Sequence, residues 1–425
     1  MRKKLLLTAF ALLAAAPAHG SGFRIPEQSL RAVALANAYG AAPAGADASY
    51  YNPAAMSWLG EGWQTEASAT WIHLASISYE DANSAARSSG SRSEDFLLPN
   101  LHLVSPEVTR FRLGFSAIYP FGLSKRWDGG LGRQYAEDFT LKTYEFNPTV
   151  SYRLADRLAI GAGLRVIHAT GEVRSLGTLP APVSLVARRD MEGDTTELGY
   201  NLALSWKPVA ELALAATYRS QIDLDMEGDA RLYLNGPLAP PNGTGGFPLT
   251  YNGYAEVKVA TPDVLTLAGS YTWCRTTFEV NWDRTFWSAY DQLDFNYDAT
   301  LNPAFASFDR PLRKDWSDTD ALRIGVSHRL NDVWTLMAGF ALDENPVPDA
   351  TLGFELPDSD AKIYSLGLAW QPTERLTLGA AYLFDDKESR SVAGASPTSM
   401  NPAGITGTFA DAAAHLVTIG GAYRF

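Results

Sequence analysis

The chain has 425 residues, one cysteine and a formal net charge of −12, from 47 acidic and 35 basic side chains. This acidity excludes a typical nucleic-acid binder, because phosphate contacts need clustered Lys and Arg. The single cysteine, Cys274, excludes an internal disulfide framework and argues against a thiolate metal site.

Residues 1–20 are predicted to be a secretory signal peptide. Three basic residues, 2–4, precede an apolar stretch, Leu5 to Ala16, that is too short to span a bilayer, and small residues occupy the cleavage positions in Ala18-His19-Gly20. Cleavage there removes three basic and no acidic residues, so the formal net charge changes from −12 to −15. We therefore expect the mature chain to function outside the cytoplasm.

Residues 21–62 are rich in alanine and glycine and do not alternate in hydropathy. Glu27–Tyr39 is predicted to form one short helix. Asn52 and Pro53 predict the start of another, with Asn52 as the N-cap and Pro53 at the first helical position. Ahead of a large strand-rich region, such a segment is interpreted as a hatch that plugs the lumen. A periplasmic tail or linker is the alternative that composition leaves open.

Residues 63–425 alternate between apolar and small or polar residues, the pattern of strands with two different faces. In Leu158–His168, for example, every second side chain is apolar, whereas Gly161 and Arg165 lie on the opposite face. Beyond the signal there is no apolar run of ~18 residues, so no transmembrane helix is predicted. Large aromatic residues at strand ends on the apolar face indicate an interfacial girdle; these are Trp206, Trp273, Trp370 and Tyr382.

Short and long connections alternate between these strands. The predicted short turns are 106–110, 155–157, 208–211, 273–275, 331–332 and 371–374. The predicted long loops are about 77–93, 122–138, 174–189, 227–250, 288–316, 344–359 and 386–411. Six turns and seven loops require fourteen strands, with short turns in the periplasm and long loops outside. The fold class is therefore all-β, a fourteen-stranded antiparallel transmembrane barrel ending on Phe425.

This barrel is expected in the outer membrane of a Gram-negative bacterium. There it would contact lipid and lipopolysaccharide, and it would need the barrel-assembly machinery during biogenesis. No enzyme is predicted, since the chain has neither a Gly-x-Ser-x-Gly elbow nor a His-Glu-x-x-His motif. Gly161-Ala162-Gly163 is interpreted as strand filler, because no helix follows it as in a phosphate loop. No cofactor and no metal site are expected.

Several blocks of the chain, in order, resemble one family. They are Ser21-Gly22-Phe23, Tyr51-Asn52-Pro53-Ala54, Tyr119-Pro120-Phe121-Gly122, Phe146–Val150 followed by Leu158–Gly163, Trp334–Pro348, and Leu356–Asp360. The chain resembles the FadL-type outer-membrane transporters of long-chain fatty acids, which include relatives for hydrocarbons. The likeness covers nearly the whole mature chain. It implies a fourteen-stranded barrel plugged by an N-terminal hatch, in agreement with the strand count.

The resemblance also implies a route for a hydrophobic ligand. An extracellular groove would pass the ligand to a pocket beside the mature N-terminus, lined by Phe23. The ligand would then leave through a lateral opening near a kink in the third strand, surrounded by Gly114, Pro120 and Gly122. The residues that would shape the hatch and its gating are Asn52, Pro53 and Ala54.

Candidate ligand contacts follow from the strand parity and from the loops. Arg165, Arg219 and Arg323 are predicted to face the lumen, where any of them could pair a carboxylate. The alternative is an internal salt bridge to an acid such as Glu145 or Glu197. Apolar loop residues are candidates for the groove, or they pack on each other as a lid; they include Leu234, Phe247, Phe286 and Trp287.

The sequence therefore predicts a passive transporter of hydrophobic molecules, with a long-chain fatty acid as the first ligand. The alternatives are an aromatic or aliphatic hydrocarbon channel of the same family and a general diffusion porin. An outer-membrane enzyme or adhesin is a more distant alternative. We expect a monomer, because a plugged and closed barrel needs no partner.

Overall fold

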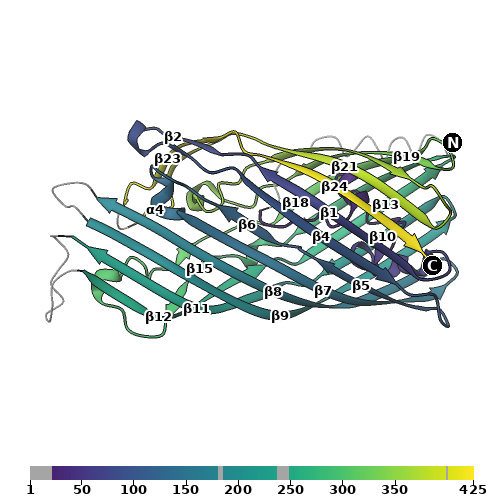
Figure 1. The fold of residues 1–425 in the computed structure, drawn as a ribbon, viewed down its shortest axis with the longest axis horizontal. Coiled ribbons are helices and arrows are strands. Elements are labelled where there is room, and N and C mark those ends of the chain that lie inside the picture. Colours follow the sequence, from purple (N-terminus) through teal and green to yellow (C-terminus); the bar gives the residue numbers. More distant parts are fainter. Residues whose placement is uncertain (1–21, 180–184, 237–247, 399–400) are drawn as a thin grey trace.

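The computed structural model of the protein describes residues 22–179, 185–236, 248–398 and 401–425. The predicted signal peptide, residues 1–20, lies outside them. The described strands form a closed antiparallel barrel, tilted across the long axis of the molecule (Figure 1). The barrel closes where β1 pairs with β24, from Gln64 opposite Arg424 to Leu74 opposite Ala414. None of the helices among the described residues is long and apolar enough to cross a membrane.

Fourteen strands make the wall, as predicted, and three of them are interrupted. In chain order they are β1 (Gln64–Leu74), β4 (Glu94–Val104), β5 (Phe111–Ile118) with β6 (Gly122–Lys125), β7 (Asp138–Ala155), β8 (Leu158–Leu179), β9 (Leu185–Val209), β10 (Leu212–Arg219) with β11 (Ile222–Asn235), β12 (Leu249–Thr261) with β13 (Val264–Trp273), β14 (Thr276–Thr285), β18 (Thr319–Arg329), β19 (Trp334–Asp343), β20 (Ala361–Trp370), β21 (Leu376–Lys387) and β24 (Ala413–Arg424).

The remaining elements belong to the N-terminal segment and to the long loops. The N-terminal segment contains α2 (Leu30–Ala34), α3 (Ala48–Tyr51) and η1 (Pro53–Trp58). The loops contain β2 (Ser78–Asp81), η2 (Ala85–Arg87), β3 (Ser89–Gly90), α4 (Gly132–Ala136), η3 (Trp287–Ala289), β15 (Gln292–Leu293), β16 (Phe295–Tyr297), η4 (Pro303–Phe305), β17 (Leu312–Arg313), η5 (Asp349–Thr351), β22 (Arg390–Ala395) and β23 (Ile405–Ala410).

In the strands, alternate side chains face the outside and the inside of the barrel, as predicted. On β8, Ile160 and Leu164 are exposed on the outer surface, whereas Ala159 and Arg165 are buried inside. The four aromatic residues assigned to the girdle, Trp206, Trp273, Trp370 and Tyr382, are exposed on the outer wall. An apolar exterior around a partly polar interior is the arrangement that a bilayer requires of a barrel.

Two of the predicted loops are wrong in extent. β8 continues to Leu179 and β9 begins at Leu185, so most of the predicted loop 174–189 is strand. Similarly, β11 continues to Asn235 within the predicted loop 227–250. These segments carry charged residues and lack the apolar face of a lipid-facing strand. They form strands nevertheless, because each pairs with a neighbouring strand. Figure 1 shows β8, β9, β11 and β12 extending to the end of the barrel that lies away from the C-terminus.

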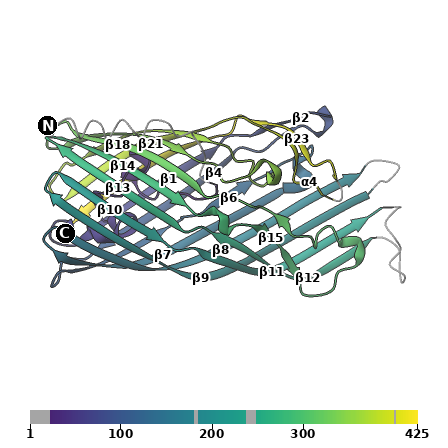
Figure 2. The ribbon, with the colours of Figure 1, turned by 180° about the vertical axis from the view of Figure 1, so that it is seen from behind.

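Residues 22–62 lie inside the barrel, near the end that holds the C-terminus (Figures 1 and 2). The predicted helix over Glu27–Tyr39 is shorter than expected. It begins after Ser29, whose hydroxyl accepts from the amide of Ala32, and it ends because Ala36 and Asn37 adopt φ angles of 47° and 64°. The predicted cap at Asn52 is present, but the helix that follows is a 3₁₀ helix, with Pro53 at its first turn. We call residues 22–62 the hatch.

Candidate functional site: a cavity at a break in the barrel wall

The barrel wall has a break between its second and third strands. β4 pairs with β5 only from Leu101–Val104 to Gly114–Ala117, and among the described residues β6 pairs with β7, on its other side. Beyond the start of β4 and the end of β6, the wall closes again. There Ser91 forms a bridge with Trp127, and the amide of Arg92 donates to the carbonyl of Arg126. The result is a bounded opening between residues 94–100 of β4 and the kinked third strand. We call it the side window.

The kink that opens the window lies between β5 and β6. Pro120 fixes the backbone there and has no N–H to donate to a neighbouring strand. The hatch supplies partners instead: Ile25 donates its amide to the carbonyl of Pro120 at 2.8 Å, and Gly122 donates to the carbonyl of Phe23 at 2.9 Å. The start of the hatch therefore lies along the kinked strand on the inner side of the wall.

Gln28 fixes the residue before the proline. Its side-chain carbonyl accepts from the amide of Tyr119 at 2.9 Å, and its side-chain NH₂ donates to the carbonyl of Tyr119 at 2.9 Å. The same NH₂ donates to the carbonyl of Ile25 at 2.7 Å. Both backbone groups of Tyr119, which the kink deprives of a strand partner, are thereby satisfied.

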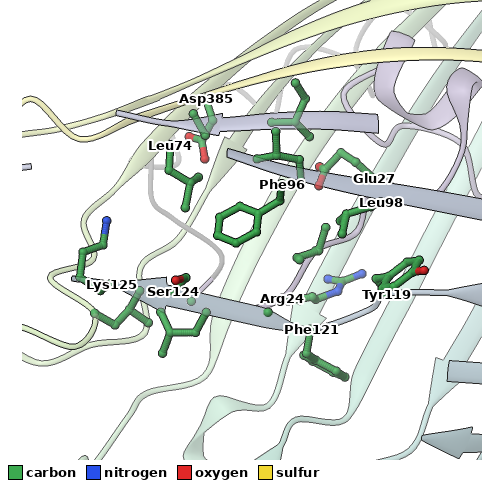
Figure 3. Close-up of a pocket in the computed structure, with 18 of the residues that line it drawn as sticks. Arg24, Glu27, Leu74, Phe96, Leu98, Tyr119, Phe121, Ser124, Lys125 and Asp385 are labelled. Carbon is green, nitrogen blue, oxygen red and sulfur yellow. The ribbon is translucent and has the colours of Figure 1, made fainter. Parts of the chain in front are cut away.

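A cavity of about 440 Å³ opens at the side window, within the size range of small-molecule sites. Its walls are mainly apolar, with Phe96 projecting into the middle (Figure 3). They come from the hatch, the loop after β19, and strands β1, β4, β6, β7, β20, β21 and β24. Leu97 and Tyr144 also border it, and both are exposed on the outer face of the barrel. The cavity therefore connects the interior of the barrel with its lipid-facing surface.

Seven charged side chains among the described residues border this cavity, and three of them form ion pairs. Arg24 pairs with Asp283 at 3.4 Å, and Lys387 pairs with Asp358 at 2.5 Å. Asp358 also accepts from the amide of Gly22 at 3.0 Å, which ties the start of the hatch to the loop after β19. Glu27, Lys125, Lys142 and Asp385 complete the charged lining. The site thus combines a long apolar surface with a few fixed charges.

Phe23 lies beside this cavity in a cage of aromatic rings. The centroid of its ring is 4.7 Å from that of Trp287, 5.8 Å from Tyr290, 5.7 Å from Trp316 and 6.0 Å from Phe121. We call this set the aromatic box. The space left around Phe23 is only about 10 Å³, so the ring itself fills the place where the sequence predicts a ligand pocket.

The three arginines predicted to face the lumen do so, and each is engaged by acids. Arg165 pairs with Glu145 at 2.9 Å, and Arg219 pairs with the other oxygen of the same carboxylate. Arg323 pairs with Asp283 at 3.2 Å and Asp343 at 2.5 Å. This is the internal salt-bridge alternative, and none of the three borders the cavity at the side window.

The four predicted groove residues lie in different places. Trp287 belongs to the aromatic box, and Phe286 lies beside it under the guanidinium of Arg284, 6.0 Å from the ring centroid. Leu234 packs in a separate cluster with Leu232, Leu249 and Phe305, as the lid alternative expects. Phe247 lies outside the described residues.

The predicted hatch and opening residues divide between two regions. Asn52 accepts from the amide of Ala55 and donates to the carbonyl of Gly40, and the Pro53-Ala54 backbone packs against Gly161 of β8. Pro120 and Gly122 lie at the side window. Gly114 does not: a Cβ there would come within 2.5 Å of the sulfur of Met56, so Gly114 accommodates the hatch at the periplasmic half of the barrel.

Sequence reasoning missed Gln28, Phe96 and Lys125. Gln28 and Lys125 stand in segments that alternation does not describe, and Phe96 has the same pattern as any strand aromatic. Of these three residues, only Lys125 could have been found from the sequence, because it lies three residues after Tyr119-Pro120-Phe121-Gly122, one of the blocks that carry the family resemblance. Across the part of the chain that the structure describes, no group of three or more His, Cys, Asp or Glu could hold a metal ion.

A closed, plugged barrel with an apolar cavity that opens sideways through its wall defines the class: a β-barrel transporter of the outer membrane. Residues 11–425 match the family model described as outer membrane protein transport protein (OMPP1/FadL/TodX), and the chain belongs to this family. It is an outer-membrane protein, as are relatives with that name.

Two curated relatives illustrate the likeness. The chain is 26% identical over 326 residues to a long-chain fatty acid transport protein of Escherichia coli O6:H1, covering 68% of this chain and 70% of that one. It is 24% identical over 426 residues to outer membrane protein P1 of Haemophilus influenzae, with 89% of each chain covered.

Two solved structures share the fold. A Pseudomonas aeruginosa FadL homologue superposes with a TM-score of 0.82 at 20% identity, covering 95% of this chain and 100% of that one. The Pseudomonas putida toluene transporter TodX gives 0.71 at 16% identity, covering 96% and 100%. Both confirm the barrel architecture.

Proposed function

We propose that this protein takes up hydrophobic molecules through the side window, and that long-chain fatty acids are the first substrate class. The observation that carries the proposal is the cavity of about 440 Å³ that runs from the hatch to Leu97 and Tyr144 on the outer wall. A hydrophobic chain gains ~0.8 kcal/mol for each CH₂ that it buries. It therefore leaves water for the cavity, and the cavity for the bilayer, without an energy source.

The aromatic box is the proposed stage before the window. A ligand from the extracellular loops would first meet Phe286 and Trp287, and it could replace the ring of Phe23 only by moving it, since the space there is about 10 Å³. The carbonyl of Phe23 accepts from Gly122 at the kink. Movement of Phe23 would thus loosen the hatch at the window, which couples entry of the ligand to its sideways exit.

Fatty acids come first because the curated relative cited above is named a long-chain fatty acid transport protein. Hydrocarbons are the second candidate, because the lining of the cavity is mainly apolar and the fold is shared with a toluene transporter. A general diffusion porin would need a water-filled passage, whereas the hatch packs against the inner wall at β7, β8, β20 and β21.

The proposal is tested by blocking the cavity. Cells that lack their own fatty-acid transporter would express the protein, or its Gly122→Phe variant, and take up radiolabelled oleate or toluene. Gly122 lines the cavity, and a Cβ there would come within 2.9 Å of Ile25, so a phenyl ring fills the window. Gly129→Phe is the matched control, because a Cβ at Gly129 meets nothing within 4 Å.

We expect Gly122→Phe to abolish oleate uptake and Gly129→Phe to leave it unchanged. Uptake of toluene alone would change the substrate class and keep the route. Uptake that is insensitive to Gly122→Phe would exclude the side window. Rapid passage of small sugars in liposome swelling, with no uptake of either hydrophobic ligand, would replace the proposal with a porin.

A further inference from the structure

We propose that Lys125 binds the anionic head group of an amphiphile, a carboxylate on an apolar chain, at one end of the cavity at the side window. The protein would thereby distinguish anionic from neutral hydrophobic molecules. This inference rests on the proposed uptake function and names its substrate class more closely.

Lys125 is the last residue of β6, and its side chain borders the cavity. It is only 5% exposed, which is unusual for a lysine. In Figure 3, Lys125 and Ser124 lie at one end of the pocket and Tyr119 at the other, with Phe96 between them. A molecule with one charge and a long apolar body fits this order of groups, with its charge beside Lys125 and its chain along Phe96 and Leu98.

The ammonium group of Lys125 has no hydrogen-bond or ion-pair partner within the described ranges. The lining has three other cations, of which Lys142 is exposed on β7 and the other two are paired. Arg24 is paired with Asp283, and Lys387 with Asp358. Glu94 attracts Lys125 only from beyond ion-pair distance. Its carboxylate oxygen Oε1 already accepts from Ser124 at 2.9 Å and lies 3.2 Å from Arg126. Among the described residues, Lys125 is therefore the buried cation of the lining that remains available to a ligand.

A buried and unpaired ammonium is an expensive arrangement, because burial removes most of its hydration and no side chain among the described residues replaces it. An incoming carboxylate would supply the missing partner through charge-assisted hydrogen bonds, which are stronger than neutral ones. A hydrocarbon would fill the same apolar space and leave the ammonium as it is. The gain from Lys125 is thus specific to an anion.

The acids of the lining restrict where an anion can sit. Glu27 borders the cavity from the hatch, and Asp385 borders it from β21, with one buried oxygen that accepts no hydrogen bond from the described residues. Both would repel a carboxylate placed beside them when they are charged. Figure 3 places Glu27 away from Lys125, toward Tyr119. Lys125 therefore fixes the orientation of the ligand as well as its class.

The test compares two ligands that differ only in the head group. Cells without their own fatty-acid transporter would express the full chain, and uptake of radiolabelled oleate and oleyl alcohol would be measured side by side. The variants are Lys125→Met, which keeps the length and removes the charge, and Lys125→Arg, which keeps the charge. Lys362→Met is the matched control, since Lys362 is exposed, pairs with Glu388 and does not line the cavity.

We expect Lys125→Met to lower oleate uptake at least tenfold, with oleyl alcohol uptake within twofold of the unaltered protein. Lys125→Arg and Lys362→Met should retain both. Equal loss of both ligands in Lys125→Met, at an unchanged level of folded barrel, would make the residue structural and overturn the inference. So would unchanged oleate uptake in Lys125→Met. An unaltered protein that takes up neither ligand would instead overturn the proposed function.

Discussion

The amide of Gly122 donates a hydrogen bond to the carbonyl of Phe23 at 2.9 Å, across a separation of about a hundred residues in the chain. With the bond from Ile25 to Pro120, it makes the first residues of the hatch a partial strand beside the kink. The wall and its plug are therefore joined by backbone atoms at the window. Side chains affect only the stability of this backbone contact between the hatch and the wall.

Gln28→Ala should loosen this joint. The substitution removes both partners of Tyr119, and a buried backbone group left unsatisfied costs about 1–3 kcal/mol. We expect faster amide hydrogen exchange in peptides covering residues 23–28 and 117–123, by roughly tenfold or more, with little change in the strands far from the window. Gln64→Ala is the control, because Gln64 donates only to the exposed turn at Gly60. Unchanged exchange at 117–123 would show that the kink is held without Gln28.

Gly161→Ala should displace the hatch. A Cβ at Gly161 would overlap the amide nitrogen of Ala54 and come within 2.6 Å of the carbonyl carbon of Pro53, and a rigid backbone cannot give way as a side chain can. Overpacking of this kind costs about 1–3 kcal/mol. Limited proteolysis should cut residues 40–60 faster in this variant. Gly269→Ala, where the new Cβ sits an ordinary 3.4 Å from Leu214, should behave like the unaltered protein.

Arg323→Met should destabilise the barrel far more than it changes the choice of ligand. The substitution leaves the buried carboxylates of Asp283 and Asp343 without this partner. Breaking a buried ion pair in this way costs about 3–5 kcal/mol. The denaturant midpoint of the folded barrel in detergent micelles should fall, and Arg329→Met, at the exposed end of β18, should leave it unchanged. A normal midpoint with lost oleate uptake would instead make Arg323 a ligand contact.

The hatch should lose stability as the pH rises from about 4.5 toward neutrality. Burial raises the pKa of the Glu27 carboxyl to about 7 from its usual 4.5, while Arg323 opposes the shift. A raised carboxyl pKa means that the folded state binds the proton more tightly than the unfolded state does. The contribution to stability is therefore complete below about pH 4.5 and is lost by about pH 7, a difference of ~3 kcal/mol.

Hydrogen exchange of residues 22–30 between pH 5 and 8, corrected for the intrinsic effect of pH, tests this dependence. Exchange should accelerate as the pH rises, and Glu27→Gln should remove the dependence because its side chain stays neutral throughout. The same pH dependence in Glu27→Gln would assign the effect to another group, such as Asp385.

The strand count was predictable because alternation and turn length are local properties. Leu158–His168 shows which face meets lipid, and each short turn fixes the direction of the next strand. The extents of the long strands were not predictable in this way. In these long strands β9 pairs with β8 on one side and with β11 on the other, and their polar ends resemble a loop in the sequence.

The candidate site was predicted in part, and the prediction came from the family resemblance and not from the alternation of residues along the strands. Pro120 and Gly122 lie at the window, whereas Gly114, in the same predicted opening, contacts the hatch. The glycine interpreted as strand filler, Gly161, is the place where the backbone of Pro53-Ala54 meets the wall. Such a contact joins residues more than a hundred positions apart, and no spacing along one strand reveals it.

The side window also sets the mechanical cost of release. Over residues 94–100, β4 shares no pairing with β6 in the described structure, so a molecule that leaves there separates no strands. In a continuous wall, each pair pulled apart in hydrocarbon would expose backbone groups at several kcal/mol apiece. Because the resting fold has no paired strands to separate at the window, release into the outer leaflet would require only a concentration gradient of the ligand. The rate of release would depend on how fast the hatch moves.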